Sequence, residues 1–185
     1  MTRLSYAIAT TAAVSLLGLA SIASFAPRLI WNASASTPVG FYTIGDVGAL
    51  DVTDLLAVDA PEPLATFLSD GDYLPRGVPL LKRVAALPGQ RVCRTGLAIT
   101  VDGVPIGDAL DRDRRGRPLP VWQGCRLVAA GELFLMNWQV RDSLDGRYFG
   151  PLPATAVIGR ATPLYTDEDG DGRFVWRADA VTARP

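Results

Sequence analysis

A single lysine stands out among the residues that could do chemistry. Lys82 lies in the apolar stretch PLLKRVAALPG (79–89), and it is the only lysine among the 18 basic residues of the chain. Apolar surroundings disfavour the charged form of an amine, and lysine can lose its proton there whereas arginine effectively cannot. A buried Lys82 would therefore be able to act as a general base. The ordinary alternative is a lysine on a strand edge that extends its ammonium group to water.

The rest of the composition narrows the chemistry. The chain has no histidine, which removes the usual general base and the usual metal ligand. Its two cysteines are too few for a structural zinc site. Basic and acidic residues nearly balance, 18 against 19, so no nucleic-acid surface is predicted. Catalysis would have to use Ser, Asp, Glu, Lys, Arg or Tyr, and we expect neither a cofactor nor a metal.

One acidic segment has part of the spacing of a calcium loop. In DEDGDG (167–172), Asp167, Asp169 and Asp171 occupy positions 1, 3 and 5 of an EF-hand-like loop. The twelfth position is Ala178 rather than the bidentate glutamate that such loops use. A solvated acidic turn is therefore the favoured interpretation, and a calcium site is the alternative.

A cluster of hydroxyl residues could supply the nucleophile that a lysine base would serve. Ser34, Ser36 and Thr37 stand in front of Pro38 and Gly40 in the segment NASASTPVGFY (32–42). A serine hydroxyl becomes nucleophilic when an adjacent base takes its proton, and lysine can be that base. Small hydroxyl residues before Pro-x-Gly are also common in ordinary turns, so the segment alone does not distinguish the two.

Three segments in chain order resemble the type I signal peptidases, and most closely their conjugative-transfer (TraF-type) branch. That branch carries N-x-[ST]-x-S-x-P-x-G before an aromatic residue, which is matched in full by Asn32, Ser34, Ser36, Pro38, Gly40 and Phe41. The second segment of the resemblance is KRVAALPG (82–89), which begins at Lys82. RDSLDGRYFGPLP (141–153) then resembles the carboxy-terminal box D-N-S-x-D-S-R-Y-[FW]-G through Ser143, Asp145, Arg147, Tyr148, Phe149 and Gly150. Residues 137–140 depart from the G-D-N-R of general signal peptidases.

The resemblance implies a serine endopeptidase with a Ser/Lys dyad. Ser36 would be the nucleophile and Lys82 its base, and Ser143 would orient the base by a hydrogen bond. The Ser36 backbone N–H and the Ser34 hydroxyl would form the oxyanion hole.

Three further residues of these motifs receive less specific roles. Asp145 and Arg147 are expected to form a structural ion pair. Asp145 is also a candidate auxiliary residue, because in the conjugative branch an acidic residue near the dyad is implicated in joining the two ends of a pilin. Asn32 completes the first motif as an auxiliary or structural residue.

The first 30 residues are predicted to form a membrane anchor. Residues 4–27 carry no charged side chain, and a bilayer core requires about 20 residues of helix. A cleaved secretory signal is the alternative, because Ser24 and Ala26 have the spacing of a cleavage site, although Pro27 would make a poor scissile bond. Whether the segment is retained or removed stays open.

Either reading exports the rest of the chain. Arg3 and the terminal amine precede the apolar segment and Arg28 follows it, which weakly favours an amino terminus in the cytoplasm. Trp31 then lies where an interfacial aromatic residue would anchor the protein. We therefore expect a single-pass inner-membrane protein whose residues 31–185 form a periplasmic peptidase domain.

Residues 31–185 have the pattern of a mostly β domain. Short β-rich runs such as GFYTIG and GELFLMNW are bounded by Gly, Pro and Asp, and VDGVPI (101–106) has the Asp-Gly signal of a hairpin. Cys93 and Cys125 lie in an exported domain, so a disulfide is favoured over two buried thiols. It would close a small hairpin subdomain at about 93–125, within which DALDRDRRGRPLP (108–120) reads as a solvated loop.

Together these features predict a signal-peptidase-like β domain with one N-terminal transmembrane helix. The expected activity is the removal of signal or leader segments from exported proteins, in particular the processing of a conjugative pilin, and cyclisation of the processed pilin is left open. The partners would be a membrane-inserted preprotein and membrane lipid. The alternatives are a general housekeeping signal peptidase and a non-catalytic exported β domain of a secretion or mating apparatus.

Overall fold

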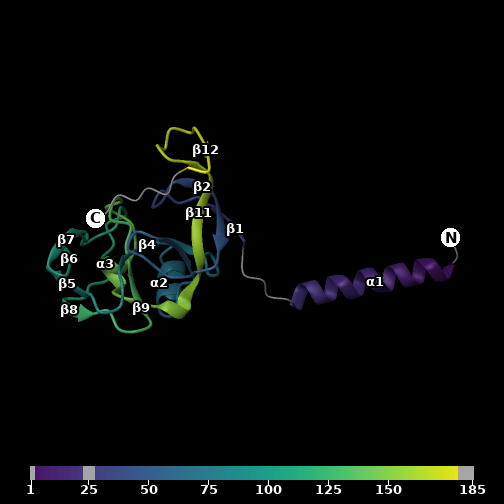
Figure 1. The fold of residues 1–185 in the computed structure, drawn as a ribbon, viewed down its shortest axis with the longest axis horizontal. Helices are drawn as coiled ribbons and strands as arrows, with labels where there is room; N and C mark the ends of the chain where they lie inside the picture. The colour runs from purple at the N-terminus through teal and green to yellow at the C-terminus, as the bar shows by residue number, and fades with distance from the viewer. Residues whose placement is uncertain (1–2, 23–27, 179–185) are drawn as a thin grey trace.

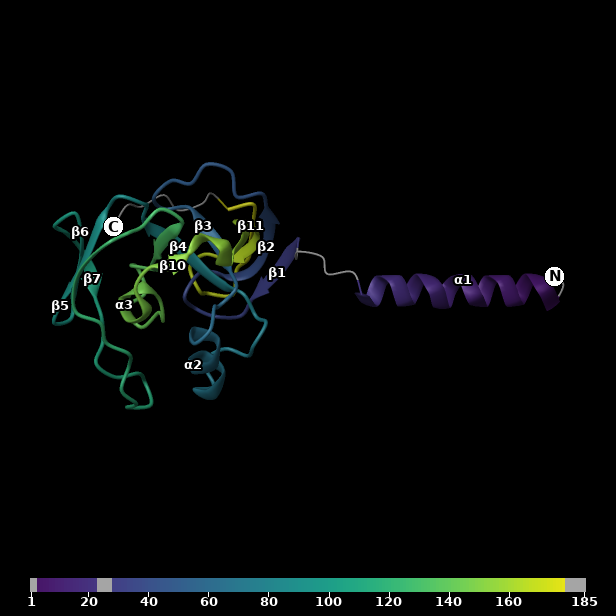
Figure 2. The same ribbon diagram turned by 90° about the horizontal axis from the view of Figure 1, so that it is seen from below.

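The computed structural model describes residues 3–22 and 28–178. Helix α1 (Arg3–Ile22) occupies most of the predicted anchor and is drawn apart from the β domain in Figure 1 and Figure 2. Within these described ranges, no helix is long and apolar enough to cross a membrane. The membrane span stays a prediction, and the candidate cleavage site at Ser24 and Ala26 lies outside the described residues.

Antiparallel strands form the main sheet of the domain, in the order β1-β2-β11-β3-β4-β9-β10, with β12 paired to β11. The strands are β1 (Leu29–Asn32), β2 (Val39–Gly45), β3 (Leu55–Val58), β4 (Leu80–Ala86), β9 (Glu132–Leu135), β10 (Leu152–Pro153), β11 (Val157–Asp167) and β12 (Val175–Trp176). The prediction of a mostly β domain is confirmed.

Position in the sheet explains the burial pattern of each strand. In β2, Tyr42 and Ile44 face the core while Phe41 and Thr43 face outward, because successive side chains point to opposite faces. β4 is paired on both edges, with β3 and with β9, and most of its residues are buried. Lys82 therefore lies in one of the most enclosed strands of the molecule.

A second, four-stranded sheet has the order β7-β6-β5-β8. Its strands are β5 (Arg91–Thr95), β6 (Ala98–Val101), β7 (Val104–Asp108) and β8 (Gly124–Leu127). Asp102 and Gly103 connect β6 to β7 with positive φ angles of 50° and 82°, which a two-residue hairpin turn requires. The predicted Asp-Gly hairpin is confirmed.

The predicted disulfide is also present. Cys93 on β5 and Cys125 on β8 are directly opposite each other in the antiparallel ladder and are bonded, with their Cα atoms 4.0 Å apart. The bond joins the two ends of the segment 93–125, which contains the β6–β7 hairpin and the loop after it.

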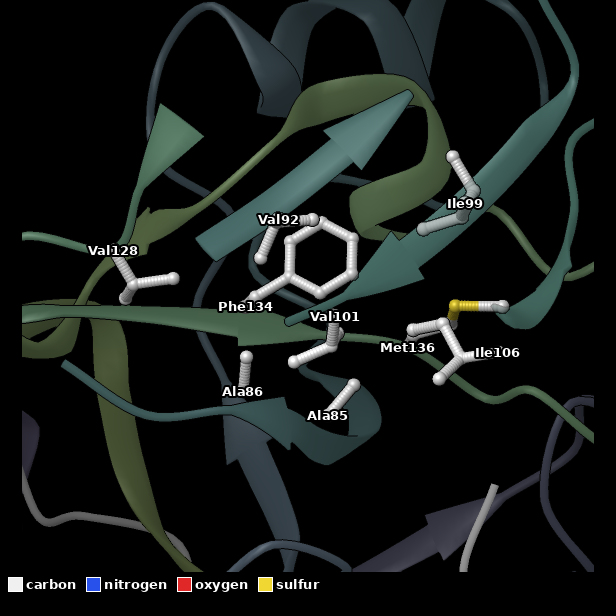
Figure 3. Packing of buried hydrophobic residues seen from close by; sticks show 9 residues of the cluster. All are labelled: Ala85, Ala86, Val92, Ile99, Val101, Ile106, Val128, Phe134 and Met136. Carbon is white, nitrogen blue, oxygen red and sulfur yellow. The ribbon is translucent and has the colours of Figure 1, made fainter. Parts of the chain in front are cut away.

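The second sheet packs on the main sheet through a shared core. Side chains from β4 and β9 pack against side chains from β5, β6 and β7 in one hydrophobic cluster (Figure 3). It consists of Ala85, Ala86, Val92, Ile99, Val101, Ile106, Val128, Phe134 and Met136. The hairpin region is therefore tied to the strand that carries Lys82.

Two short helices and a 3₁₀ turn complete the domain. Helix α2 (Leu64–Asp70) follows β3, and α3 (Gly146–Phe149) begins after Asp145, whose carboxylate accepts a hydrogen bond from the Arg147 N–H. A carboxylate in this position caps the first turn of a helix. A 3₁₀ turn (Ala154–Ala156) links β10 to β11.

We expect the disulfide to stabilise the domain measurably. Because it joins residues 32 positions apart, replacing both cysteines with serine should lower the free energy of unfolding by about 3–4 kcal/mol in the chain-entropy description. Urea unfolding of the full chain in detergent would measure the loss, and reduction of the wild type should reproduce it. Equal midpoints for the oxidised and reduced proteins would contradict the prediction.

Candidate active site

Lys82 is almost completely buried and points to a serine. Its side chain is 5% exposed, and Nζ donates a hydrogen bond of 2.8 Å to Ser143 Oγ. Burial lowers the pKa of Lys82 from its ordinary value of 10.5 to about 8, while the negative charge of Asp145 opposes this shift and the positive charge of Arg147 adds to it. The amine can therefore be neutral near physiological pH.

Ser36 lies in the turn between β1 and β2, and Asn32 holds this turn together. Asn32 Oδ1 accepts hydrogen bonds from the Ser34 N–H at 3.1 Å and from Ser34 Oγ at 2.8 Å. Its Nδ2 donates to the carbonyls of Ser34, Thr37 and Pro38 and to Thr37 Oγ1. A single side chain thus ties most of the turn's backbone, which gives Asn32 a structural place in the site.

The hydroxyl protons of the turn have a defined direction. Ser34 Oγ lies 3.1 Å from Ser36 Oγ. Because a hydroxyl has one proton and Ser34 donates its own to Asn32 Oδ1, Ser36 must be the donor to Ser34. In this state Ser36 directs its proton to Ser34, and Ser34 has no proton free for an oxyanion.

The four predicted residues Ser34, Ser36, Lys82 and Ser143 line one cleft of about 490 Å³. Within the described part of the chain, Lys82 Nζ bonds to Ser143 and not to Ser36. The structure therefore brings the nucleophile and base candidates to the same cavity without joining them by a hydrogen bond. Such contacts are often long in the absence of substrate.

The cleft is largely apolar, and part of its wall was not predicted. The apolar lining residues are Ala35, Leu68, Leu74, Leu80, Leu110, Leu119, Val140 and Leu144. Two of them, Leu110 and Leu119, come from the segment 108–120, which was predicted to be a solvated loop. That prediction was wrong for its two ends, because Leu110 and Leu119 face the cleft, and the charged residues Asp113, Arg114, Arg115 and Arg117 between them also contribute to its lining.

Polar contacts hold this segment against the chain that follows α2. Tyr73 donates to Asp113 at 2.6 Å, and Arg117 donates to the Gly71 carbonyl at 2.8 Å. The Arg117 guanidinium also lies 4.3 Å from the centre of the Tyr73 ring. Arg114 pairs with Asp142 next to Ser143. The segment 110–119 thus spans from the end of α2 to the loop that carries Ser143.

Asp145 and Arg147 form a fully buried ion pair. Arg147 Nε donates to Asp145 Oδ1 and Nη2 donates to Oδ2, each at 2.8 Å. Arg147 also donates to the carbonyl oxygens of Asn137, Val140, Arg141 and Ser143. Both Asp145 oxygens have protein donors, and the residue does not line the cleft. The pair cross-links the loop that presents Ser143.

Two buried polar residues near this loop had no role assigned to them from the sequence motifs. Arg94 on β5 donates to the Arg147 carbonyl at 2.6 Å, which connects the second sheet to α3. Asn137 donates to the carbonyl of Ser36 at 2.8 Å and to that of Leu81 at 3.0 Å. The only signal for Asn137 was that it stands where general signal peptidases have glycine.

The acidic segment 167–172 lies near a smaller cleft of about 310 Å³ that Ser36 also lines. The Asp167 carboxylate accepts hydrogen bonds from the N–H groups of Asp171 and Gly172. Among residues 3–22 and 28–178, no group of three or more His, Cys, Asp or Glu side chains is arranged to hold a metal ion.

A mostly β domain that gathers serines and a buried lysine at one cleft has the components of a serine peptidase. Comparison with known proteins agrees: the sequence model of the signal peptidases, peptidase S26, matches residues 1–166. The chain belongs to this family, and at the family level it is a serine peptidase.

The relatives also confirm the resemblance to the TraF-type branch. The chain is 36% identical over 167 residues to a probable conjugal transfer protein TraF of Sinorhizobium fredii, an alignment that covers 84% of this chain and 86% of the relative. It is 32% identical over 143 residues to a plasmid transfer protein TraF of Escherichia coli, covering 75% and 76%. Among solved structures, a signal peptidase I from Enterococcus faecalis aligns with a TM-score of 0.38 and 19% identity, covering 62% of this chain and 98% of that one.

We expect Lys82 to make stability depend on pH in the alkaline range. The pKa of Lys82 is about 8 in the folded protein and 10.5 when unperturbed. At a pH between these two values, Lys82 is protonated in the unfolded state and neutral in the folded state. Stability relative to Lys82→Met should then rise with pH above about 8, by about 1.4 kcal/mol per pH unit. Urea unfolding of both proteins between about pH 7 and 10 measures this, and a difference that does not change with pH would contradict it.

Proposed function

We propose that this protein is a membrane-anchored serine endopeptidase that removes signal or leader segments from exported proteins, with Ser36 as nucleophile and Lys82 as base. The observation that carries the proposal is the enclosure of Lys82. A buried amine with a pKa near 8, bonded to Ser143, shares a cleft with Ser36. A domain that only binds a partner has no need of a buried amine beside two serines.

The proposed reaction follows from the groups at the cleft. Neutral Lys82 takes the proton of Ser36 Oγ as that oxygen attacks the scissile carbonyl. The charge on the carbonyl oxygen is stabilised by the Ser36 N–H and the Ser34 hydroxyl. Lys82 then passes the proton to the leaving amine. In the second half, Lys82 takes a proton from a water that attacks the acyl carbonyl, and it returns this proton to Ser36 Oγ as the ester bond breaks and the new carboxyl end of the product leaves. Ser143 accepts a hydrogen bond from Lys82 and orients the amine throughout.

The reactive state differs from the observed one in the hydrogen bonds of two hydroxyl groups. Ser36 Oγ must turn its proton from Ser34 to Lys82, and Ser34 must turn its proton from Asn32 Oδ1 to the substrate oxygen. Rotation about a hydroxyl moves only its proton, so Ser36 Oγ must also come within hydrogen-bond distance of Lys82 Nζ. An arriving carbonyl oxygen supplies the acceptor that draws the Ser34 proton away from Asn32.

The substrate is proposed to be a preprotein of a conjugation system, with a pre-pilin as the first candidate. The relatives named as conjugal or plasmid transfer proteins support this choice. The largely apolar cleft suits small or apolar residues before the cut. Cyclisation of the product does not form part of the proposal, because both oxygens of Asp145 are engaged by Asn137 and Arg147.

The proposed location is the periplasmic face of the inner membrane, with residues 1–30 as a single-pass anchor. An exposed aromatic group on β1, β2, β11 and β12 supports a bilayer surface next to the site. Trp31 contacts Phe41 and Phe174, and Tyr165 contacts Phe174 and Trp176. Aromatic side chains favour the membrane–water interface, and β1 begins at Leu29, at the end of the proposed anchor segment.

Replacement of Lys82 by arginine tests the role of the base. Lys82→Arg keeps the positive charge but cannot deprotonate, so cleavage of a co-expressed pre-pilin should fall by at least about a thousandfold. Mass spectrometry of the pilin measures the loss and also separates a linear product from a cyclic one, which is lighter by one water.

The matched control for this variant is Arg91→Lys, an exchange between the same residue types at an exposed position of β5, which should leave processing unchanged. Circular dichroism establishes that each variant is folded. Wild-type processing by a folded Lys82→Arg protein would rule out the proposed mechanism. Rescue of general preprotein cleavage by the wild type would instead place the protein among the housekeeping enzymes.

The pH profile tests the protonation state that the mechanism requires. With a pKa of about 8, roughly a tenth of Lys82 is neutral at pH 7 and most of it at pH 9. Values of kcat/KM for a peptide substrate should therefore rise about tenfold over this interval. A profile that is flat or falls between these values would show that the reaction does not depend on neutral Lys82.

A further inference from the structure

Asn137 is a buried amide that contacts the backbone of Ser36 and of both neighbours of Lys82. The residue is 3% exposed. Its Nδ2 donates to the Ser36 carbonyl at 2.8 Å and to the Leu81 carbonyl at 3.0 Å, and its Oδ1 accepts from the Arg83 N–H at 3.1 Å. Leu81 and Arg83 are the two neighbours of Lys82 in β4.

The position of Asn137 in the sheet explains these contacts. The ladder between β4 and β9 pairs Val84 with Leu135, and the Met136 N–H still donates to the Arg83 carbonyl at 2.9 Å. If the ladder continued in register beyond Met136, Asn137 would lie opposite Lys82, but the backbone turns away from β4 there. The Asn137 side chain supplies one donor and one acceptor to β4 there, as a strand backbone would.

The second Nδ2 proton reaches the turn that carries the nucleophile. Asn137 and Ser36 are 101 positions apart in the chain. Among the hydrogen bonds of the described residues, Ser36 has one other contact, with Ser34 of its own turn. The Asn137 amide is therefore the link between Ser36 and the strand of Lys82. Its planar –NH₂ group holds the two carbonyl oxygens at a fixed separation.

The backbone of Asn137 is itself held by the buried ion pair. Its N–H donates to Asp145 Oδ2 at 3.0 Å, and its carbonyl accepts from Arg147 Nη2 at 3.4 Å. The same pair therefore fixes Ser143, which bonds the base, and Asn137, which bonds the turn of the nucleophile.

We infer that Asn137 is a positioning residue that sets the placement of Ser36 relative to Lys82. The inference rests on the proposed function and deepens it. The hydrogen bonds of Asn137 go to backbone groups and to Asp145 and Arg147, and not to Ser36 Oγ or Lys82 Nζ, so its effect is on the geometry of attack and not on the basicity of Lys82. Small losses of alignment between nucleophile and base can lower rates by about a hundredfold.

The test uses Asn137→Ala and Asn137→Asp in the full chain. Asn137→Ala should lower kcat and the rate of Ser36 acylation by a small fluorophosphonate about 10- to 100-fold, with KM and the pH midpoint of activity near those of the wild type. Asn137→Asp keeps the acceptor for the Arg83 N–H and loses both donors. It should lose at least as much acylation, and its pH midpoint should rise because a carboxylate near Lys82 favours the charged amine.

The matched control is Gln90→Ala. Gln90 also bridges a backbone N–H and a second group, accepting from Leu87 N–H and donating to Asp102, but it lies away from the cleft. Rates are referred to the concentration of folded protein, measured by circular dichroism in the same sample. The control should keep its acylation rate even where its stability falls.

The outcomes separate this inference from the proposed function. If Ser36→Ala and Lys82→Arg are inactive while both Asn137 variants acylate within about twofold of the wild type, Asn137 has no positioning role. An equal loss in Gln90→Ala would assign the effect to general destabilisation and would also overturn the inference. If Ser36→Ala or Lys82→Arg remains active, the proposed function fails first.

Discussion

The buried ion pair of Asp145 and Arg147 is the interaction on which the site depends. It lies in the loop after β9, where no strand partner is available for the backbone, and Arg147 supplies the missing donors to four carbonyl oxygens. Breaking such a pair by removing one partner typically costs about 3–5 kcal/mol, because the remaining charge is left buried and unpaired. The loop is therefore held in one conformation, and Ser143 and Asn137 both take their positions from it.

The same pair also shapes the electrostatics of the base. Burial alone would lower the pKa of Lys82, and the nearby negative charge of Asp145 limits that effect. Arg147 acts in the opposite direction and adds to the lowering of the Lys82 pKa. The result is an amine whose pKa of about 8 lies close to the range in which a general base is effective.

The second sheet contributes to the site from a distance. Its hairpins share a core with β4 and β9, and Arg94 reaches from β5 to the carbonyl of Arg147. The disulfide joins β5 to β8 immediately next to Arg94. A region that resembles an appendage in the sequence is thus part of the support of α3, and the segment 110–119 that leaves it forms a wall of the cleft.

Local features of the sequence determined the class of fold, the Asp-Gly hairpin and the identity of the chemical groups. The alternation of apolar and polar residues, the turn residues and the single lysine in an apolar stretch are each visible within a few positions of the sequence. They can therefore be recognised without knowledge of the fold. The cysteine pairing could be predicted from the expected export of the chain and from there being two cysteines. Only the tertiary structure decided that Asp145 is enclosed, that Leu110 and Leu119 face the cleft, and that Ser36 bonds Ser34 while Lys82 bonds Ser143. It also decided that Asn137 joins two segments 101 positions apart. These arrangements depend on how the sheets pack and where β9 leaves the ladder, because a buried polar group takes whichever partner the folded chain brings within reach.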